Sequence, residues 1–220
     1  MGSSALEQFV ALDALRVRHG FTGRIPGIDV AHDKDVALAH LDAVHRKLRG
    51  EIGDFPFATA KQIHGNEIAV IDQALAADRC FDGCDGLITN QRDLALGIYI
   101  ADCAAVYLVD RERRAIGLVH SGRKGTELGI VARAIALLET RFGVPPRDLV
   151  AQISPCIRPP HYEVDFAAEI ARQCRDAGVI GVHDCGICTA CDLERYYSYR
   201  AEKGKTGRML ALLAIGSAND

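Results

Sequence analysis

The sequence predicts a mixed α/β protein of the α+β class, and three observations support this prediction. Short runs rich in β-branched and aromatic residues, typical of buried strands, follow one another between residues 86 and 121. Apolar residues also recur on one helical face over residues 33–48 and 125–142. With 220 residues, of which 49% are hydrophobic and 25% charged, the chain can bury a substantial core.

The first elements are predicted near the N-terminus. Residues 16–24 have the pattern of a strand, and the glycine and proline of the following turn, IPGID, should reverse the chain. A helix is expected over residues 33–48 with Asp33 as its N-cap, because its apolar positions repeat every three to four residues. Two histidines on this helix are interpreted as solvated or packing residues: His40 and His45.

A β-hairpin is predicted next. Two β-rich runs, residues 55–64 and 67–72, are separated by Gly65-Asn66, a pair that favours a tight turn. This arrangement places His64 at the end of a strand. The following residues, 72–86, carry several aspartates and glycines and are predicted to form a polar loop.

Buried strands then dominate the middle of the chain. They are expected at residues 86–89, 94–102, 105–110 and 115–121. Asp102 and Cys103 end one of these strands and His120 ends another. Because polar residues at strand ends are exposed while the strands are buried, a thiol and an imidazole are held rigidly at a surface.

The C-terminal half combines helices with two further strands. A helix after Gly125 should bury one stripe of residues: Leu128, Val131, Ile135, Leu138 and Phe142. Its first turn, SGRKGT, either holds an anion at free backbone N–H groups or uses its glycines only for a tight turn. A strand at 148–154 and a helix capped by Asp165 follow, and residues 193–216 predict a short helix, a basic turn and a last strand. With no internal repeat or linker, a single domain over residues 1–220 is expected.

Charge and composition exclude several classes of function. The net charge of −3 gives no reason to expect a nucleic acid or an anionic membrane as partner, and a small neutral or anionic substrate fits better. No apolar run reaches the length of a membrane-spanning helix, and the opening residues MGSSALEQF lack the features of a secretion signal. We therefore expect a cytoplasmic protein whose eight cysteines are mainly reduced thiols.

Three interpretations of His64, Cys103 and His120 are open from the residues alone. As a metal site, two imidazoles and one thiolate are three zinc ligands with a fourth position left for water or substrate, which is typical of catalytic zinc. As a nucleophilic site, Cys103 would attack and His120 would deprotonate it, with Asp102 or a backbone carbonyl orienting the imidazole. In the third interpretation, Cys103 is a buried core cysteine and the histidines are ordinary residues at strand ends.

A second candidate metal site is the run C-x2-C-x2-C. Cys185, Cys188 and Cys191 have a spacing suited to iron–sulfur or zinc binding, and His183 is a candidate fourth ligand. A blue-copper site is disfavoured, because it wants an axial methionine and the chain has only two methionines.

A series of motifs runs in order along nearly the whole chain. They are FTGR at 21–24, KQIHGNEI at 61–68, CDGLIT at 84–89, GIYIADCAAVYLVD at 97–110, HSGRKGT at 120–126, SPCIRPPHYEV at 154–164, CTAC at 188–191, YYSYR at 196–200 and TGR at 206–208. This ordered set resembles the YfiH family, also called the laccase-domain or polyphenol-oxidase family.

The resemblance implies a layered α/β/β/α fold with mixed sheets and a zinc site at His64, Cys103 and His120, with copper as the alternative metal. It implies a purine nucleoside phosphorylase that takes adenosine, inosine or methylthioadenosine, with some adenosine deamination. Family members have also been assigned to peptidoglycan editing and copper-dependent phenol oxidation, and the fold is similar to that of cysteine–histidine deamidase toxins. For Cys188 and Cys191 it implies a role in supporting the fold.

On this basis Cys103, His120 and Asp102 are expected to be catalytic in the turnover of a purine nucleoside with phosphate. An incoming anion needs charge-assisted donors, and three cations are expected around it: Arg24, Lys124 and Arg200. Three further residues are expected to contact the substrate: Gln62, Tyr162 and Glu163.

The chain departs from the family pattern at several positions. Lys124 replaces an arginine, Ser154 and Arg158 replace glycines, and Pro160-His161 replace paired cysteines. Because a lysine lacks the bidentate fork of an arginine, these departures affect the expected substrate chemistry more than the metal site. Two rival functions therefore stay open, a metal-independent Cys–His hydrolase or amidase and a binding protein that kept the fold and lost the chemistry.

Overall fold

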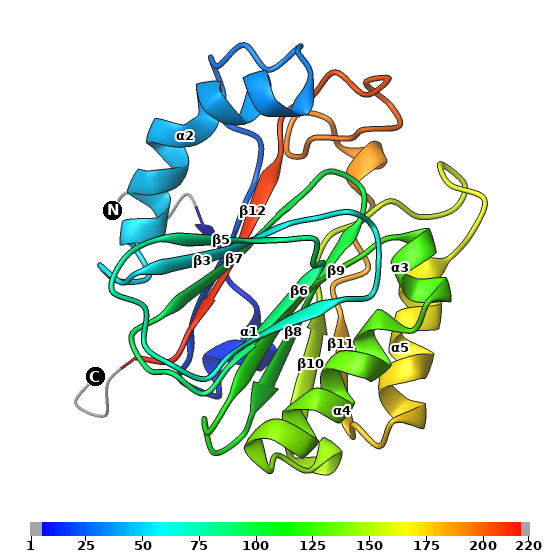
Figure 1. Ribbon diagram of the computed structural model, residues 1–220. Coiled ribbons are helices and arrows are strands. Elements are labelled where there is room, and N and C mark those ends of the chain that lie inside the picture. The colour runs from blue at the N-terminus through cyan, green and yellow to red at the C-terminus, as the bar shows by residue number, and fades with distance from the viewer. Residues whose placement is uncertain (1–5, 217–220) are drawn as a thin grey trace.

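Two β-sheets packed face to face form the centre of the protein (Figure 1). The computed structural model describes residues 6–216; residues 1–5 and 217–220, which include part of the opening segment MGSSALEQF, lie outside the described residues. Within residues 6–216 each sheet has six strands. The first sheet has the order β1 (Leu6–Glu7), β2 (Arg18–Thr22), β12 (Met209–Ala214), β7 (Ala95–Ile100), β3 (Phe57–Lys61) and β5 (Arg79–Asp82). The second has the order β11 (Gly181–Asp184), β10 (Leu149–Ile153), β8 (Ala104–Asp110), β9 (Ile116–Ser121), β6 (Gly86–Thr89) and β4 (Ile68–Ile71).

Helices cover the outer faces of both sheets. Among the described residues the covering helices are α2 (Lys34–Gly50), α3 (Arg123–Glu127), α4 (Ile130–Phe142) and α5 (Phe166–Asp176), with short 3-10 turns at Pro146–Asp148 and Thr189–Cys191. The short helix α1 (Val10–Asp13) instead buries Leu12 in the apolar layer between the sheets. Figure 1 shows α2 on one side of the sheets and α3, α4 and α5 on the other. This is the predicted α/β/β/α layering with mixed sheets, in which β3 and β7 pair in parallel while β8 and β9 pair antiparallel.

Three apolar layers hold these elements together. Between the sheets, Phe21, Leu96, Tyr107 and Leu118 are fully buried in one cluster. Similar clusters join α2 to the first sheet and join α4 and α5 to the second sheet. Burial of this kind stabilises the fold because apolar surface leaves water, by about 25 cal/mol per Å². No helix within residues 6–216 is both long and apolar enough to cross a membrane.

Most predicted strands are confirmed, but the hairpin at Gly65-Asn66 is wrong. β3 belongs to the first sheet and β4 to the second, so the turn passes the chain from one sheet to the other. The predicted polar loop at 72–86 also contains a strand, β5, which pairs in parallel with β3 at the edge of the first sheet. Its residues are mostly exposed and do not alternate in hydrophobicity, so the pattern gave no strand signal.

The helices differ from prediction at one break. The helix expected after Gly125 is divided into α3 and α4 by Gly129, whose φ of 71° is left-handed. Leu128 lies at this break and is 47% exposed, so it does not join the buried stripe. The short helix expected after residue 193 is absent from the described residues 193–208, which form turns. Asp165 caps α5 as predicted, because its carboxylate accepts a hydrogen bond from the Ala168 N–H at 3.0 Å.

Candidate active site and metal centre

His64, Cys103 and His120 meet although they come from three separate segments. Their ligand atoms all lie within 4.8 Å of one another. Cys103 lies in the turn between β7 and β8, His120 lies in β9, and His64 follows β3 in the left-handed conformation with a φ of 59°. The two imidazole rings are nearly perpendicular, with centroids 4.8 Å apart.

Strand pairing and one glycine explain how the thiol reaches the histidines. In the antiparallel pair of β8 and β9, Ala105 lies opposite His120, which puts the turn containing Cys103 beside the end of β9. Gly122 leaves the space that the thiol occupies, since a Cβ at this position would collide with Sγ of Cys103. A side chain at residue 122 is therefore incompatible with the observed position of the thiol.

Asp85 holds two of these groups in place. Its carboxylate is fully buried and accepts four hydrogen bonds, from the backbone N–H groups of Ile63, His64 and Gly65 at 2.7 to 3.1 Å and from Nδ1 of His120 at 2.8 Å. Burial alone would raise the pKa of Asp85, but the hydrogen bonds outweigh it and lower the pKa to about 2. The bond to Nδ1 leaves Nε2 of His120 free to act as a ligand or base.

The thiol and the imidazole stabilise each other's charged forms. Burial would raise the pKa of Cys103, but the neighbouring His120 and His64 lower it. Burial would lower the pKa of His120, but Cys103 and Asp85 raise it. Cys103 is thus prepared as a thiolate, the form needed both for metal binding and for nucleophilic attack.

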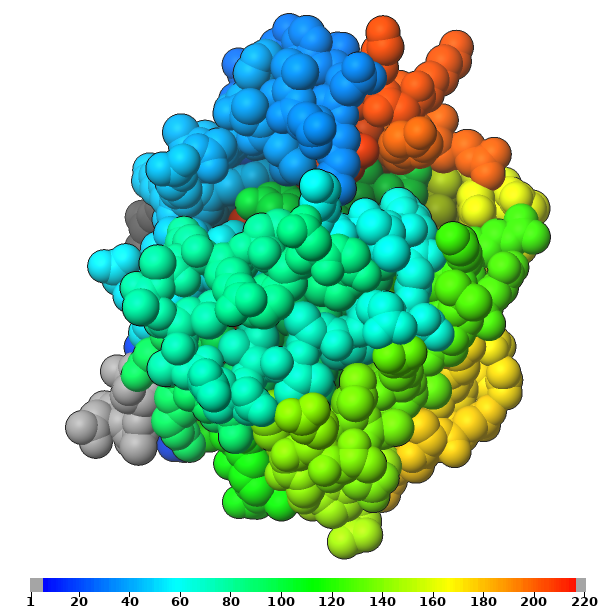
Figure 2. Space-filling model, in the orientation of Figure 1, coloured from blue at the N-terminus to red at the C-terminus, as the bar shows by residue number. Residues whose placement is uncertain are grey.

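The three donors lie in the wall of a cavity of about 880 Å³. Figure 2 shows the surface hollowed between the blue atoms of α2 and the orange C-terminal segment on one side and the cyan segment near residue 65 on the other. Five cations are among the described residues that line the cavity: Lys34, Arg123, Lys124, Arg200 and Arg208. Four aromatic rings also line it: Tyr99, Tyr162, Phe166 and Tyr199. This lining suits an anion together with a flat, partly apolar group.

Four of the predicted substrate residues line this cavity: Gln62, Lys124, Tyr162 and Arg200. The Gln62 side chain donates to the Tyr99 carbonyl at 2.8 Å, while its buried Oε1 has no partner among the described residues. A buried acceptor without a partner is costly, so a donor on a ligand would satisfy it. Glu163 does not line the cavity, but it accepts a hydrogen bond from Arg200 at 3.2 Å.

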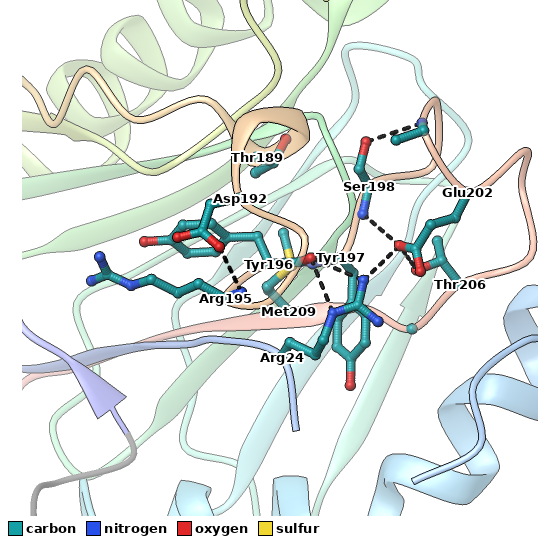
Figure 3. Close-up of polar contacts among 12 residues, drawn as sticks. Arg24, Thr189, Asp192, Arg195, Tyr196, Tyr197, Ser198, Glu202, Thr206 and Met209 are labelled. Carbon is teal, nitrogen blue, oxygen red and sulfur yellow. Dashed lines mark hydrogen bonds and ion pairs between the residues drawn. The ribbon is translucent and has the colours of Figure 1, made fainter. Parts of the chain in front are cut away.

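Arg24 was expected beside phosphate, and the structure places it elsewhere. Its guanidinium donates to the Tyr196 carbonyl at 3.0 Å and pairs with Glu202 at 2.8 Å, as Figure 3 shows. It also stacks over the Tyr197 ring. Arg24 therefore fastens the C-terminal segment to the start of the chain and is not among the described residues lining the cavity.

Asp102 lines the cavity, but its carboxylate has structural partners. It accepts hydrogen bonds from the Thr189 hydroxyl and from the Arg200 backbone N–H, both at 2.7 Å. The His120 ring is oriented by the Asp85 carboxylate, and not by Asp102 or a backbone carbonyl, the two groups considered from the sequence. Asp102 is thus a positioning residue that joins three segments around Cys103.

Several cavity residues were missed by sequence reasoning. Lys34 begins α2, and burial together with the charge of Arg208 lowers the pKa of the lysine. Arg208 belongs to the TGR motif and stacks on Tyr199. The available signals were the motif membership of Arg208 and, for Asp85 behind the cavity wall, its position in CDGLIT directly before the predicted buried strand 86–89.

Two of the departures from the family pattern have structural partners. The Ser154 hydroxyl accepts from the Ala105 N–H at 2.9 Å and donates to the Pro155 carbonyl at 3.0 Å. Arg158 pairs with Asp184. Of Lys124, Ser154 and Arg158, only Lys124 lines the cavity.

The candidate triple-cysteine site is not assembled in the structure. Within residues 6–216, Cys188 and Cys191 form a cluster with His161, whereas Cys185 and His183 belong to no such cluster. Cys185 instead packs against the apolar layer between the two sheets.

Comparison with known proteins gives a consistent result. The model of the multi-copper polyphenol oxidoreductase laccase family matches residues 26–169 and 164–216. A purine nucleoside phosphorylase of Corynebacterium glutamicum is 34% identical over 179 residues, covering 70% of this chain and 72% of the relative. The purine nucleoside phosphorylase YlmD of Geobacillus stearothermophilus is 26% identical over 245 residues, covering 92% and 89%.

Solved structures share the fold. The crystal structure of YlmD from Geobacillus stearothermophilus has a TM-score of 0.77 at 22% identity, covering 98% of this chain and 100% of that chain. The hypothetical protein YfiH of Bacillus licheniformis has a TM-score of 0.78 at 23% identity, covering 91% and 93%.

Proposed function

The chain belongs to the multi-copper polyphenol oxidoreductase laccase family, which includes YfiH, and on this premise we propose that it is a zinc-dependent purine nucleoside phosphorylase. The names of its relatives support a nucleoside phosphorylase. The observation that carries the proposal is the convergence of His64, Cys103 and His120 on a cavity lined by cations and aromatic rings. Adenosine, inosine and methylthioadenosine are the proposed nucleosides, with adenosine deamination as a minor activity.

The donor set fits one zinc ion better than several copper ions. Two imidazoles and one thiolate are a ligand set of catalytic zinc, with a fourth position left open toward the cavity. A multi-copper centre needs many histidines, and only two of the eight histidines line the cavity. The Met209 sulfur accepts a hydrogen bond from the Tyr197 N–H at 3.1 Å and is not a cavity group. Copper remains the alternative metal.

In this proposal the protein's own residues bind and orient both substrates. Phosphate would lie among the cations, with Lys124 and Arg200 as donors, and the purine would contact the aromatic rings. A phosphate oxygen forms a bond to C1′ of the ribose while the bond from C1′ to the purine nitrogen breaks, and that nitrogen takes the electron pair. Zinc at His64, Cys103 and His120 would supply a Lewis acid.

Turnover of a purine nucleoside with phosphate tests this proposal. Inosine or adenosine is incubated with phosphate, and chromatography measures the free base and ribose 1-phosphate. Cys103→Ala should lose turnover together with the zinc held in the cavity, whereas Cys80→Ala, at an exposed cysteine outside the cavity, should keep both. No turnover of any purine nucleoside by zinc-loaded protein would contradict the proposal and favour a binding protein. Deamination would appear as inosine formed from adenosine without phosphate.

One observation favours a second candidate, a metal-independent Cys–His hydrolase or amidase acting on a peptidoglycan precursor. Asp85, His120 and Cys103 follow one another in the order of an orienting acid, a base and a thiolate. Such an enzyme would need only one histidine at the thiol, and the position of His64 beside Cys103 is better explained by a metal. Full activity in metal-free protein would favour this second candidate.

We also propose that residues 1–220 form a single domain that acts in the cytoplasm. The apolar layer shared by both sheets supports the first point. The second is supported by the eight cysteines, all of which are free thiols.

A further inference from the structure

A second cluster of soft ligands lies beside the cavity. Nδ1 of His161 is 3.4 Å from Sγ of Cys191 and 3.8 Å from Sγ of Cys188. The three ligand atoms lie within 4.8 Å of one another, and none of the three residues is among those lining the cavity. We propose that His161, Cys188 and Cys191 bind a second zinc ion. The ion would join two loops next to the active site, the loop between β10 and α5 that contains His161 and the loop after β11 that contains both cysteines.

The spacing and chemistry of these donors suit zinc. With bonds of about 2.3 Å to sulfur and about 2.0 Å to nitrogen, tetrahedral zinc separates its ligand atoms by roughly 3.5 to 3.8 Å. The observed distances from Nδ1 to the two sulfurs, 3.4 and 3.8 Å, are close to these values. Two thiolates in a C-x2-C pair and one imidazole are soft ligands that select zinc over hard cations. Because His161 and Cys191 are exposed, water completes the coordination.

The backbone already holds these donors in position. The N–H of Cys191 donates to the Cys188 carbonyl at 3.2 Å, which closes a turn and brings the two cysteines together. Cys156 joins the two loops, because its N–H donates to the Ile187 carbonyl and its carbonyl accepts from the Thr189 N–H, both at 3.2 Å. Zinc binding therefore has little chain entropy to overcome.

The second ion acts on residues of the active site. His161 directly precedes Tyr162, which lines the cavity. Cys188 directly precedes Thr189, whose hydroxyl donates to Asp102, the neighbour of Cys103. The second ion thus fixes both the loop that carries Tyr162 and the hydroxyl that holds Asp102. The role proposed for this ion is to hold the two loops, and its binding does not depend on the phosphorylase activity proposed above.

Zinc stoichiometry in the full chain tests the inference. After removal of metal and incubation with Zn²⁺ under reducing conditions, gel filtration and elemental analysis should find two equivalents in the wild type and one in Cys191→Ser or His161→Ala. Cys185→Ser is the matched control and should retain two, because this cysteine precedes Cys188 at the same spacing but packs against the core. Thermal unfolding checks that each variant is folded. If Cys191→Ser or His161→Ala does not fold, the zinc content of the other variant tests the inference.

Cobalt provides a readout that does not depend on turnover. In Cys103→Ser the remaining Co²⁺ is bound at the second cluster by two thiolates, and in Cys191→Ser it is bound in the cavity by one. The thiolate charge-transfer absorption per ion should therefore be about twofold stronger in Cys103→Ser than in Cys191→Ser. The inference is overturned if the wild type binds one equivalent or if Cys191→Ser still binds two. It is also overturned if mass spectrometry finds a Cys188–Cys191 disulfide in protein kept under reducing conditions, or if the second equivalent binds only as weakly as zinc binds to nonspecific surface sites.

Discussion

Replacing Asp85 by asparagine should damage the fold and the metal site together. The carboxylate accepts hydrogen bonds from Ile63, His64, Gly65 and His120. An asparagine has one acceptor oxygen, so its NH2 group must face two of these donors. If it faces His120, a hydrogen bond forms only when Nδ1 becomes an acceptor, which puts the ring proton on Nε2 and blocks that atom as a ligand.

The size of the effect follows from the lost bonds. Two hydrogen bonds to a charged group are replaced by unsatisfied or repulsive contacts, at about 1.5 to 3 kcal/mol each, so the free energy of unfolding should fall by about 3 to 6 kcal/mol. Loss of a partner that orients a metal ligand lowers metal affinity by about 10- to 100-fold. Urea unfolding measures the first effect, and zinc titration against a chelating indicator measures the second.

A buried aspartate outside the cavity is the matched control. Asp110 is fully buried and accepts hydrogen bonds from Arg114, including one from its Nε at 2.7 Å. Asp110→Asn should lower the free energy of unfolding but leave zinc affinity unchanged. If Asp85→Asn binds zinc as tightly as the wild type, or unfolds at the same urea concentration, the Asp85 carboxylate does not hold the metal ligands in place.

Three further predictions concern the thiol pocket, acid stability and phosphate. Gly122→Ala should displace the Cys103 thiol and lower zinc affinity by about 10- to 100-fold, whereas Gly50→Ala, whose added methyl group meets open space, should not. The same indicator titration measures both affinities, and equal values would show that the Gly122 position does not control the thiol. Burial lowers the pKa of His45 from 6.5 to about 4. The unfolded chain therefore binds the proton first as the pH falls, and the free energy of unfolding should drop by up to about 3 kcal/mol between pH 6.5 and 4. His45→Leu should flatten this part of the urea-unfolding profile, and an unchanged slope would refute the assignment. Lys124→Ala should raise the KM for phosphate by about tenfold with a smaller effect on kcat, and an unchanged KM would remove this lysine from the phosphate site.

Much of the fold was predictable because its strands and helices bury regular apolar patterns. β6, β7, β8 and β9 are almost entirely buried, so their sequences are mainly apolar and carry polar residues only at or near the strand ends. The wrong hairpin shows the limit of local signals. A tight turn at Gly65-Asn66 is compatible both with a hairpin and with a crossing between sheets, and long-range pairing decides between them.

The candidate site was predictable in its donors but not in their support. The sequence motifs identified His64, Cys103 and His120 as candidate ligands, and the topology brings these three residues together. The bond from His120 to Asp85 spans 35 residues, and that from Arg24 to Tyr196 spans 172, so neither partner can be read from local sequence.

The same limit applies to the second cluster. The even spacing of its cysteines suggested a triple site. The chain folds so that His161 from another loop replaces Cys185, and only the three-dimensional arrangement of the two loops shows this.

Restoring zinc to metal-free protein tests the central claim most directly. Inosine and phosphate are supplied, and ribose 1-phosphate formation is followed as Zn²⁺ is titrated in and its bound amount is measured. We expect no turnover without metal and a rate that rises with zinc bound at His64, Cys103 and His120, and Cys103→Ala should be inactive at every zinc concentration. Full turnover in metal-free protein, or equal turnover in Cys103→Ala, would contradict it.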